Sequence, residues 1–422
     1  MRTRAVPVFV VFLLNGIVAG SWAPRMPSLA EQIGASPGVL GLVLLGASVG
    51  LAAAASVAGR LCARFGARVM ILVSAVAAAG LLPVLALVTS PLQLGLVLVL
   101  LGVSFGLFDV SMNVAAVTVI RRANRPLMPV FHAGFSFGAL GGSLAAAVAA
   151  GHRVDLLSYF TLVTLASLAV AAVVIRHVPT AAPTAGAPEQ RGGFDRSMLR
   201  RPVLWLLGGV AFISAVVEGS NGDWSALFAV RERGMSEAAG AIMYSVFCLA
   251  MGVVRLVGER IERRFGAIRI LVAGSLLAGA GLLMAAIVPV ASLTYAGYVL
   301  AGTGVAFAFP VAIELAGAVG RRSDGTGGER EIGFVTTIAY SGFLIGPPVI
   351  GGVAELTNLS VAVGFIGVVA MLMAPAALAA AAARRREDRS RHPQTDPPPP
   401  SRTRPRAQPV GRPPGPLPRT PR

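Results

Sequence analysis

Long apolar runs, separated by short polar and charged segments, make up most of the chain. Twelve of these runs are about 20 residues long, the length of α-helix that crosses the hydrocarbon layer of a bilayer. The runs cover residues 5–24, 38–59, 69–89, 92–119, 128–150, 156–176, 202–228, 237–258, 268–290, 293–318, 332–354 and 359–383. Because a spanning helix satisfies its own backbone hydrogen bonds, the pattern predicts an all-α membrane protein with twelve transmembrane helices.

A polar segment rich in Pro, Ala and Gly separates the sixth run from the seventh and predicts a division of the chain. We expect an N-terminal six-helix half over 1–176, a cytoplasmic linker over 177–201 and a C-terminal six-helix half over 202–383. The remaining segment, 384–422, is rich in Arg and Pro and lacks apolar periodicity, so we expect a disordered cytoplasmic tail there.

The charge distribution predicts the orientation of these helices. Only 13% of the residues are charged and 55% are hydrophobic, whereas a soluble domain carries about 25% charged residues. All 36 basic residues are Arg, and 31 of them fall in segments on the side of the two termini. Cytoplasmic loops carry such an excess, so we expect a multi-pass protein of the cell membrane with both termini in the cytoplasm. A basic groove for nucleic acid is not indicated.

An internal repeat links the two predicted halves. The sequence Arg64-Phe65-Gly66-Ala67 returns 200 residues later as Arg264-Phe265-Gly266-Ala267. Gly102 has its counterpart in Gly302 at the same offset, and Trp22 matches Trp224 at an offset of 202. Two related six-helix halves of this kind rock about a binding site at the middle of the membrane.

Asp109 is the first candidate for chemistry, because it lies inside the fourth run. A carboxylate at that depth costs roughly 2.5–3.5 kcal/mol on insertion scales, so it needs a role such as binding a proton. Asn113 follows one helical turn later on the same face. The alternative is a structural hydrogen-bond anchor to a neighbouring helix.

The seventh run contains the polar stretch Glu218-Gly219-Ser220-Asn221-Gly222-Asp223-Trp224. Two glycines beside charged residues suggest local unwinding at membrane depth, where freed backbone groups can bind a ligand. We predict Glu218 as a second proton-coupling residue and Asn221, Asp223 and Trp224 as substrate contacts, although Trp224 could instead anchor the helix at the membrane interface.

Other polar residues on apolar faces could line a central cavity. We assign Asn15, His132 and Tyr340 as further candidate substrate contacts, and His132 is also a candidate proton carrier. Arg255 lies within the eighth run and could snorkel to the interface or pair with Glu259 at i+4. Arg25 follows Pro24 at the end of the first run, where it could attract an anionic substrate or belong to a loop.

The segment from Gly59 to Arg68 resembles the signature loop of the major facilitator superfamily, G-x-L-x-D-R-x-G-R-R, except that Ala63 and Ala67 replace an acidic and a basic position. A second copy starts at Gly258. The resemblance covers the first 383 residues or so and implies a transporter of two six-helix halves. It implies conformational switch loops at Gly59, Arg60, Arg64, Gly66, Arg68, Glu259, Arg264 and Gly266. These arginines could alternatively serve only as topology signals.

A narrower resemblance, to the fucose-permease-like branch, rests on Gly106-Leu107-Phe108-Asp109-Val110-Ser111-Met112-Asn113. That branch uses an acidic residue and an Asn at these two places for proton coupling and sugar contact. Its acidic residue in the first helix has no counterpart in Ser21–Arg25.

We therefore predict a proton-coupled secondary transporter, a symporter of a small, sugar-like organic solute that works by alternating access. Proton-driven efflux of lipophilic compounds is the alternative, and a non-transporting membrane receptor or scaffold is the alternative of another class. The sequence shows no nucleotide-binding loop, metal cluster or nucleophile, so we expect neither an enzyme nor a cofactor nor a metal site. The expected partners are the solute, protons and the lipid bilayer; we expect a monomer.

Overall fold

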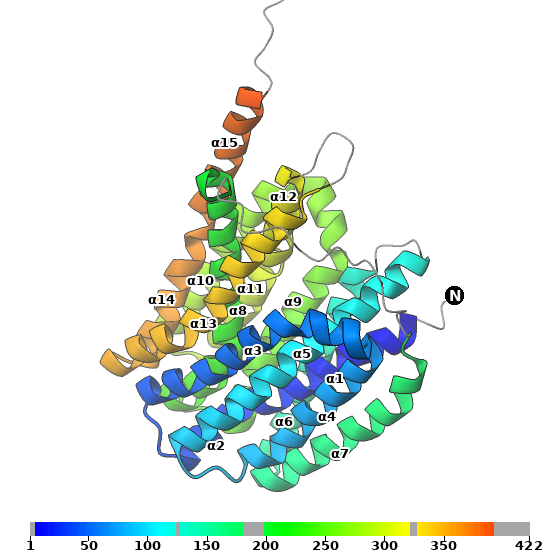
Figure 1. The fold of residues 1–422 in the computed structure, drawn as a ribbon. Coiled ribbons are helices and arrows are strands. Elements are labelled where there is room, and N and C mark those ends of the chain that lie inside the picture. Colours follow the sequence, from blue (N-terminus) through cyan, green and yellow to red (C-terminus); the bar gives the residue numbers. More distant parts are fainter. Residues whose placement is uncertain (1–4, 124–126, 180–197, 321–326, 392–422) are drawn as a thin grey trace, which may run out of the picture.

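The protein is an assembly of long helices in a computed structural model that describes residues 5–123, 127–179, 198–320 and 327–391 (Figure 1). The helices are α1 (Ala5–Trp22), η2 (Ala23–Arg25), α2 (Met26–Gln32), α3 (Pro37–Phe65), α4 (Ala67–Leu85), α5 (Pro91–Ala123), α6 (Met128–Gly151), α7 (Leu156–Val174), η3 (Ile175–His177), η4 (Met198–Arg200), α8 (Pro202–Arg233), α9 (Glu237–Phe265), α10 (Ala267–Ile287), α11 (Ala291–Val305), α12 (Ala308–Gly320), α13 (Glu329–Leu356), α14 (Leu359–Met371) and α15 (Met373–Arg391). Within the described ranges, 12 segments are long and apolar enough to cross a membrane, which confirms the predicted number.

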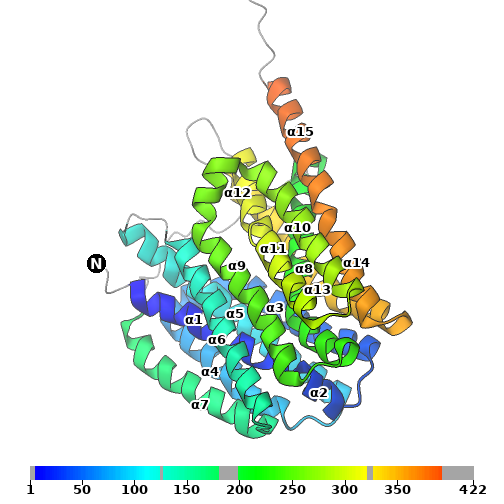
Figure 2. The ribbon, with the colours of Figure 1, turned by 180° about the vertical axis from the view of Figure 1, so that it is seen from behind.

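The spans form two bundles of six, which we call the N-terminal bundle (α1 to α7) and the C-terminal bundle (α8 to α15). Figures 1 and 2 show them from opposite sides, with the blue-to-green helices grouped apart from the green-to-orange ones. One apolar core continues between the bundles, because Met26 and Leu29 of α2 belong to the same buried cluster as Trp224 and Leu227 of α8. The expected fold of two pseudo-symmetric six-helix halves is confirmed.

The internal repeat is visible in helices α3 and α9, which are both 29 residues long. Each starts after a serine N-cap, Ser36 or Ser236, whose side chain accepts a hydrogen bond from a backbone N–H in the first turn. Each ends at a glycine with positive φ, which is 82° at Gly66 and 81° at Gly266. Glycine adopts this conformation without the steric cost of a side chain, so the two signature loops turn in the same way.

Close helix crossings repeat at the same offset. A Cβ atom added to Gly102 of α5 would lie 1.9 Å from the carbonyl oxygen of Ala47 in α3. A Cβ atom added to Gly302 of α11 would lie 2.5 Å from the carbonyl oxygen of Phe247 in α9. Both crossings need glycine because the helix backbones touch there.

The two bundles meet toward one side of the molecule. In Figure 1, α1 starts at the right and α15 ends at the top, and we call these two ends of the bundles together the termini face. The opposite, lower-left side, where α2 lies, is the far face. Inter-bundle contacts at the far face are Arg25 Nε to Glu237 Oε1 at 3.5 Å, Arg231 Nη2 to the Ala35 carbonyl oxygen at 3.3 Å, and Gly38 N to Glu355 Oε2 at 2.9 Å.

Two further inter-bundle hydrogen bonds lie in the middle of the helices. Ser48 Oγ donates to the Phe343 carbonyl oxygen at 2.7 Å, and the hydroxyls of Ser143 and Ser245 are 2.7 Å apart. Among the described residues, no hydrogen bond joins the bundles at the termini face, where Figures 1 and 2 show them diverging. The bundles are therefore closed against each other at the far face only.

Two features of the helices differ from the expectations. Helix α8 is continuous from Pro202 to Arg233, so the predicted unwinding in the stretch from Glu218 to Trp224 was wrong. Gly219 serves packing, because a Cβ atom there would lie 2.9 Å from the ring of Phe343. Helix α15 continues to Arg391, past the expected boundary at residue 383, and the rest of the tail lies outside the described residues, as does most of the expected linker.

Candidate functional site

Glu218 and Arg255 form an ion pair inside the C-terminal bundle. Arg255 Nη2 lies 3.1 Å from Glu218 Oε2, and Arg255 Nε donates to the carbonyl oxygen of Ala306 at 3.3 Å. The side chain of Glu218 is 26% exposed and that of Arg255 is 16% exposed. Glu218 occupies the middle of the 32-residue helix α8, so both charges lie at membrane depth, where each needs a compensating partner.

Arg255 was expected either to snorkel or to pair with Glu259, and the pairing with Glu259 was wrong. Glu259 instead pairs with Arg263 at 3.3 Å, where both side chains are mostly exposed. Arg255 of α9 instead contacts the carboxylate of Glu218 in α8. The pair therefore joins two spans of the C-terminal bundle.

His132 brings the N-terminal bundle close to this ion pair. It lies near the start of α6, within electrostatic range of both Arg255 and Glu218, and it is exposed. Its ring packs edge-on against Phe12 with 5.4 Å between centroids. Helices α6 and α9 run antiparallel along the bundle boundary, as the contacts of Ser136 with Gly252 and of Ser143 with Ser245 show. His132 is thus a titratable group of one bundle that faces charges of the other.

Asp109 and Asn113 form a local pair on α5. The amide Nδ2 of Asn113 donates to the Asp109 carboxylate at 3.2 Å and to the Asp109 carbonyl oxygen at 2.8 Å. Both side chains are partly exposed, and no ion pair among the described residues engages Asp109. Tyr340 of α13 lies within electrostatic range of Asp109. A second carboxylate at membrane depth therefore also lies near the boundary between the bundles.

One face of α8 carries a stripe of polar residues, Ser214, Glu218, Asn221 and Ser225, which we call the α8 polar stripe. Their 4, 3, 4 spacing places them on one side of the helix. The hydroxyls of Ser214 and Ser225 and both amide atoms of Asn221 are buried without a hydrogen-bond partner. Buried polar atoms without partners cost about 1–3 kcal/mol each, so this face is suited to a polar ligand or to water.

The other predicted contacts differ in accessibility. Trp224 is 1% exposed, which rules out its role as an anchor at the lipid interface, and its indole N–H has no partner. Asp223 is partly exposed. Asn15 is buried; its Nδ2 donates to the sulfur of Met112 at 3.4 Å, and its Oδ1 is unpaired.

The signature loops lie at the termini face, away from the Glu218–Arg255 ion pair and the α8 polar stripe. Arg64 stacks over the ring of Phe65 at 5.3 Å, and Arg264 stacks over Phe265 at 5.5 Å, as the repeat requires. Arg68 donates from Nε to the carbonyl oxygen of Val178 at 2.9 Å and so ties α4 to the segment after η3. Gly59, Arg60 and Glu259 are exposed. The assigned switch role of the loops stays a prediction.

Sequence reasoning missed a cluster at the far face. The side chain of Arg25 is 4% exposed and contacts Glu237, the carbonyl oxygen of Val154 at 3.4 Å and the ring of Tyr159 at 5.6 Å. Glu237 also accepts a hydrogen bond from Ser28. We call Arg25, Ser28 and Glu237 the far-face clasp. Arg25 is therefore neither a free loop residue nor open to an anionic substrate in this conformation.

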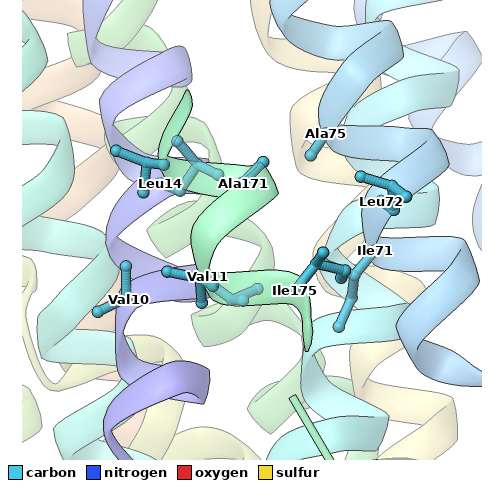
Figure 3. A pocket seen from close by; sticks show the side chains of 10 residues that line it. Val10, Val11, Leu14, Ile71, Leu72, Ala75, Ala171 and Ile175 are labelled. Carbon is cyan, nitrogen blue, oxygen red and sulfur yellow. The ribbon is translucent and has the colours of Figure 1, made fainter. Parts of the chain in front are cut away.

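A pocket inside the N-terminal bundle has a different character (Figure 3). It lies between α1, α4 and the end of α7, and its lining side chains are all apolar: Val10, Val11, Leu14, Ile71, Leu72, Ala75, Val170, Ala171, Val174 and Ile175. It offers no hydrogen-bond partner to a polar solute. Within the described ranges, no three His, Cys, Asp or Glu side chains are grouped to hold a metal ion.

Comparison with known proteins gives matches along most of the chain. Residues 8–327 match the pattern of the Major Facilitator Superfamily. An uncharacterized MFS-type transporter of Yersinia pestis is 31% identical over 378 residues, which is 89% of this chain and 95% of that protein. The membrane protein MosC of Rhizobium meliloti is 29% identical, over 87% of this chain and 88% of MosC.

Solved structures show the same fold at low sequence identity. A mutant of the nucleoside transporter NupG has a TM-score of 0.73 at 14% identity and covers 89% of this chain and 99% of its own. A bacterial homologue of the human lysosomal transporter Spinster, in an inward-facing and unoccupied conformation, has a TM-score of 0.65 at 17% identity. It covers 92% of this chain and 97% of its own.

Proposed function

Since the chain belongs to the major facilitator superfamily, we propose that this multi-pass membrane protein is a proton-coupled transporter of a small, polar, sugar-like solute. The two bundles alternate in exposing the site between them. The arginine distribution supports a location in the cell membrane with both termini in the cytoplasm. With that orientation, the closed far face and the diverging termini face correspond to an inward-facing conformation.

The observation that carries this proposal is that both bundles hold carboxylates at membrane depth: Asp109 in the N-terminal bundle, and Glu218 and Asp223 in the C-terminal bundle. Asp109 has no ionic partner among the described residues, and Glu218 has Arg255. A carboxylate without a cation is costly in this setting, so it favours the neutral, protonated form when the site closes. Binding and release of a proton can then bias the equilibrium between the two conformations.

The polar character of the substrate follows from unsatisfied groups near the middle of the spans. Asn221 and the serines of the α8 polar stripe, together with Asn15, hold buried polar atoms that a hydroxylated solute could satisfy. The nucleoside transporter NupG shows that the same fold serves a polar solute in another protein. The fucose-like pattern at Asp109 and Asn113 agrees with this substrate class. These observations favour the uptake of a polar solute over the efflux of lipophilic compounds.

The test starts with substrate identification by thermal shift of the purified protein. Sugars, sugar acids, amino acids and lipophilic cations are compared, because a ligand at 100 times its Kd adds about 2.7 kcal/mol to the free energy of unfolding. Stabilisation by lipophilic cations alone would point to efflux and contradict our assignment.

The identified solute is then used with Asp109→Asn in proteoliposomes. We expect this variant to lose accumulation driven by a pH gradient and to keep counterflow exchange of the solute, because the amide cannot carry the proton. Asp155→Asn is the matched control, since Asp155 lies outside the spans at the N-cap of α7. Normal accumulation by Asp109→Asn would refute the proton role of Asp109.

A further inference from the structure

Arg255 has unused hydrogen-bonding capacity at membrane depth. Its guanidinium engages Glu218 through Nη2 and the Ala306 carbonyl oxygen through Nε. No contact among the described residues engages Nη1, and the side chain is 16% exposed. An arginine presents five N–H donors in a planar fork that matches a carboxylate in two-point geometry. The group is therefore reachable and can accept an anionic ligand.

The charge of Arg255 is balanced by Glu218 alone among the contacts described. If Glu218 takes up a proton, the positive charge of Arg255 remains at membrane depth without a counter-ion. Such a charge is strongly unfavourable unless another anion replaces the lost one. A ligand carboxylate would restore the balance, so protonation of Glu218 and binding of an anion favour each other.

Hydroxyl-binding groups lie beside this charge on the same helix face. Asn221 is one turn from Glu218 on the α8 polar stripe, is 5% exposed, and has both its amide donor and its amide acceptor unpaired. Ser214 and Ser225 extend the stripe on either side with unpaired hydroxyls. A hydroxyl group can donate to Oδ1 or accept from Nδ2 of the amide. A ligand that carries a carboxylate for Arg255 would thus find a partner for a hydroxyl in Asn221, one turn from Glu218, whereas Ser214 and Ser225 have no exposed surface in this conformation.

From these contacts we propose that Arg255 binds the carboxylate of a sugar acid, a hydroxylated carboxylic acid, and that Glu218 occupies this place when the site is empty. The inference rests on the proposed function and narrows its substrate class. The proton goes onto the Glu218 carboxylate, and the substrate anion takes the freed guanidinium. The proton on Glu218 balances the charge of the bound carboxylate, so these two groups together carry no net charge; a proton on Asp109 is counted separately.

Other charged or titratable groups surround Glu218. Tyr244 and Cys248 face it from α9, Asp223 lies on its own helix, and His132 faces it from α6. A proton on His132 would add a positive charge to the same place and would strengthen binding of the anion. The pH dependence of binding therefore needs the Glu218→Gln variant to be assigned.

The experiment compares D-glucuronate with D-glucose, and D-glycerate with glycerol, by calorimetric titration of the purified protein between pH 5 and 8. For the wild type we expect the acid of each pair to bind more tightly than its neutral analogue, with up to a tenfold gain in affinity per pH unit as the pH falls. In Glu218→Gln, which mimics the protonated carboxyl, binding of the acid should lose most of this pH dependence.

Arg255→Gln should weaken binding of the acid at least tenfold and leave binding of the neutral analogue within a factor of two. The double variant Glu218→Gln/Arg255→Gln leaves no unpaired charge in the span, so it guards against misfolding of the single variant; it should also lose the preference for the acid. Arg263→Gln is the matched control, because it removes an arginine from an ion pair at the exposed end of the same helix.

Equal affinity for acid and neutral analogue, or an unchanged preference in Arg255→Gln, would overturn this inference while leaving a neutral sugar as substrate of the proposed transporter. Stabilisation only by lipophilic compounds would overturn both. In proteoliposomes, uptake of the acid should follow an imposed pH gradient; uptake of the acid that ignores the gradient would contradict the link between protonation of Glu218 and binding of the carboxylate.

Discussion

Removing the carboxylate of the far-face clasp should shift the balance between the two conformations. The change is Glu237→Gln, which keeps the size of the side chain and removes its charge. Glu237 belongs to the C-terminal bundle, whereas Arg25 and Ser28 belong to the N-terminal bundle, so these contacts exist only when the far face is closed. We expect the variant to populate the conformation with an open far face more than the wild type does.

The magnitude follows from the geometry of the contact. The other contacts of Arg25, to Val154 and Tyr159, lie within its own bundle and persist in either conformation. A hydrogen bond to a charged group contributes about 1.5–3 kcal/mol, whereas a solvent-exposed pair contributes about 0–1 kcal/mol. The 3.5 Å contact of Arg25 is an ion pair without a hydrogen bond, whereas Ser28 donates a hydrogen bond to the carboxylate. Because Glu237 is 24% exposed, we take the lower end for the two contacts together, about 1.5 kcal/mol. That free energy changes the ratio of open to closed far faces by about tenfold.

The assay is a distance measurement by double electron–electron resonance across the far face. Spin labels at Glu31→Cys in α2 and Leu356→Cys at the end of α13 report on the separation of the bundles, and both positions are exposed. The two native cysteines are buried and are replaced by serine in all samples. The wild type should show mainly the short distance, and Glu237→Gln should gain a longer one.

The matched control removes a carboxylate charge from the same face without touching the bundle interface. Asp155 accepts a hydrogen bond from the Ser158 backbone N–H at 2.9 Å, which lowers the pKa of its carboxyl, so it is charged at neutral pH. Asp155→Asn should leave the distance distribution of the wild type unchanged. Superimposable distributions for the wild type and Glu237→Gln would refute the reasoning, because the clasp would then contribute nothing to closure.

Two further predictions concern packing and the tail. Gly102→Ala should lower the free energy of unfolding by about 1–3 kcal/mol, because its Cβ would collide with the Ala47 carbonyl; Gly80→Ala, which meets nothing within 4 Å, should be close to neutral in the same thermal-denaturation assay. Deletion of residues 392–422 should leave transport in proteoliposomes unchanged, because it retains the 2.8 Å ion pair of Arg201 with Glu387; loss of all activity at normal membrane levels would instead favour a receptor or scaffold that works through the tail.

The fold could be predicted from the sequence because its signals are local or periodic. Each span is an apolar run long enough to cross the membrane. The repeat consists of identical residues 200 positions apart, such as Gly66 and Gly266. The repeat also locates the close helix crossings at Gly102 and Gly302. These features need no knowledge of which distant side chains meet.

The site was harder to predict because its partners are distant in the sequence. Arg255 has an acidic residue at i+4, yet its partner is Glu218 on the preceding span, and a single sequence does not distinguish these choices. The clasp between Arg25 and Glu237 joins the two bundles and has no local signal at all. The glycines of α8 resemble helix breakers, but the packing of Phe343 against Gly219 explains why a continuous helix needs one there.

The repeat of the fold is not a repeat of the chemistry, and this difference constrains the mechanism. At an offset of 200, Asp109 corresponds to Phe309, Asn113 to Ile313 and His132 to Ile332, and at 202 Glu218 corresponds to Gly16. Asp223 likewise corresponds to Ser21 at 202, so each bundle holds carboxylates at membrane depth that the other lacks. Neither bundle alone carries the full set of proton-binding and anion-binding groups. Coupling of a proton on Asp109 to a solute bound at Arg255 must therefore act across the boundary where α6 meets α9 and where Tyr340 approaches Asp109, which is the boundary that alternating access opens and closes.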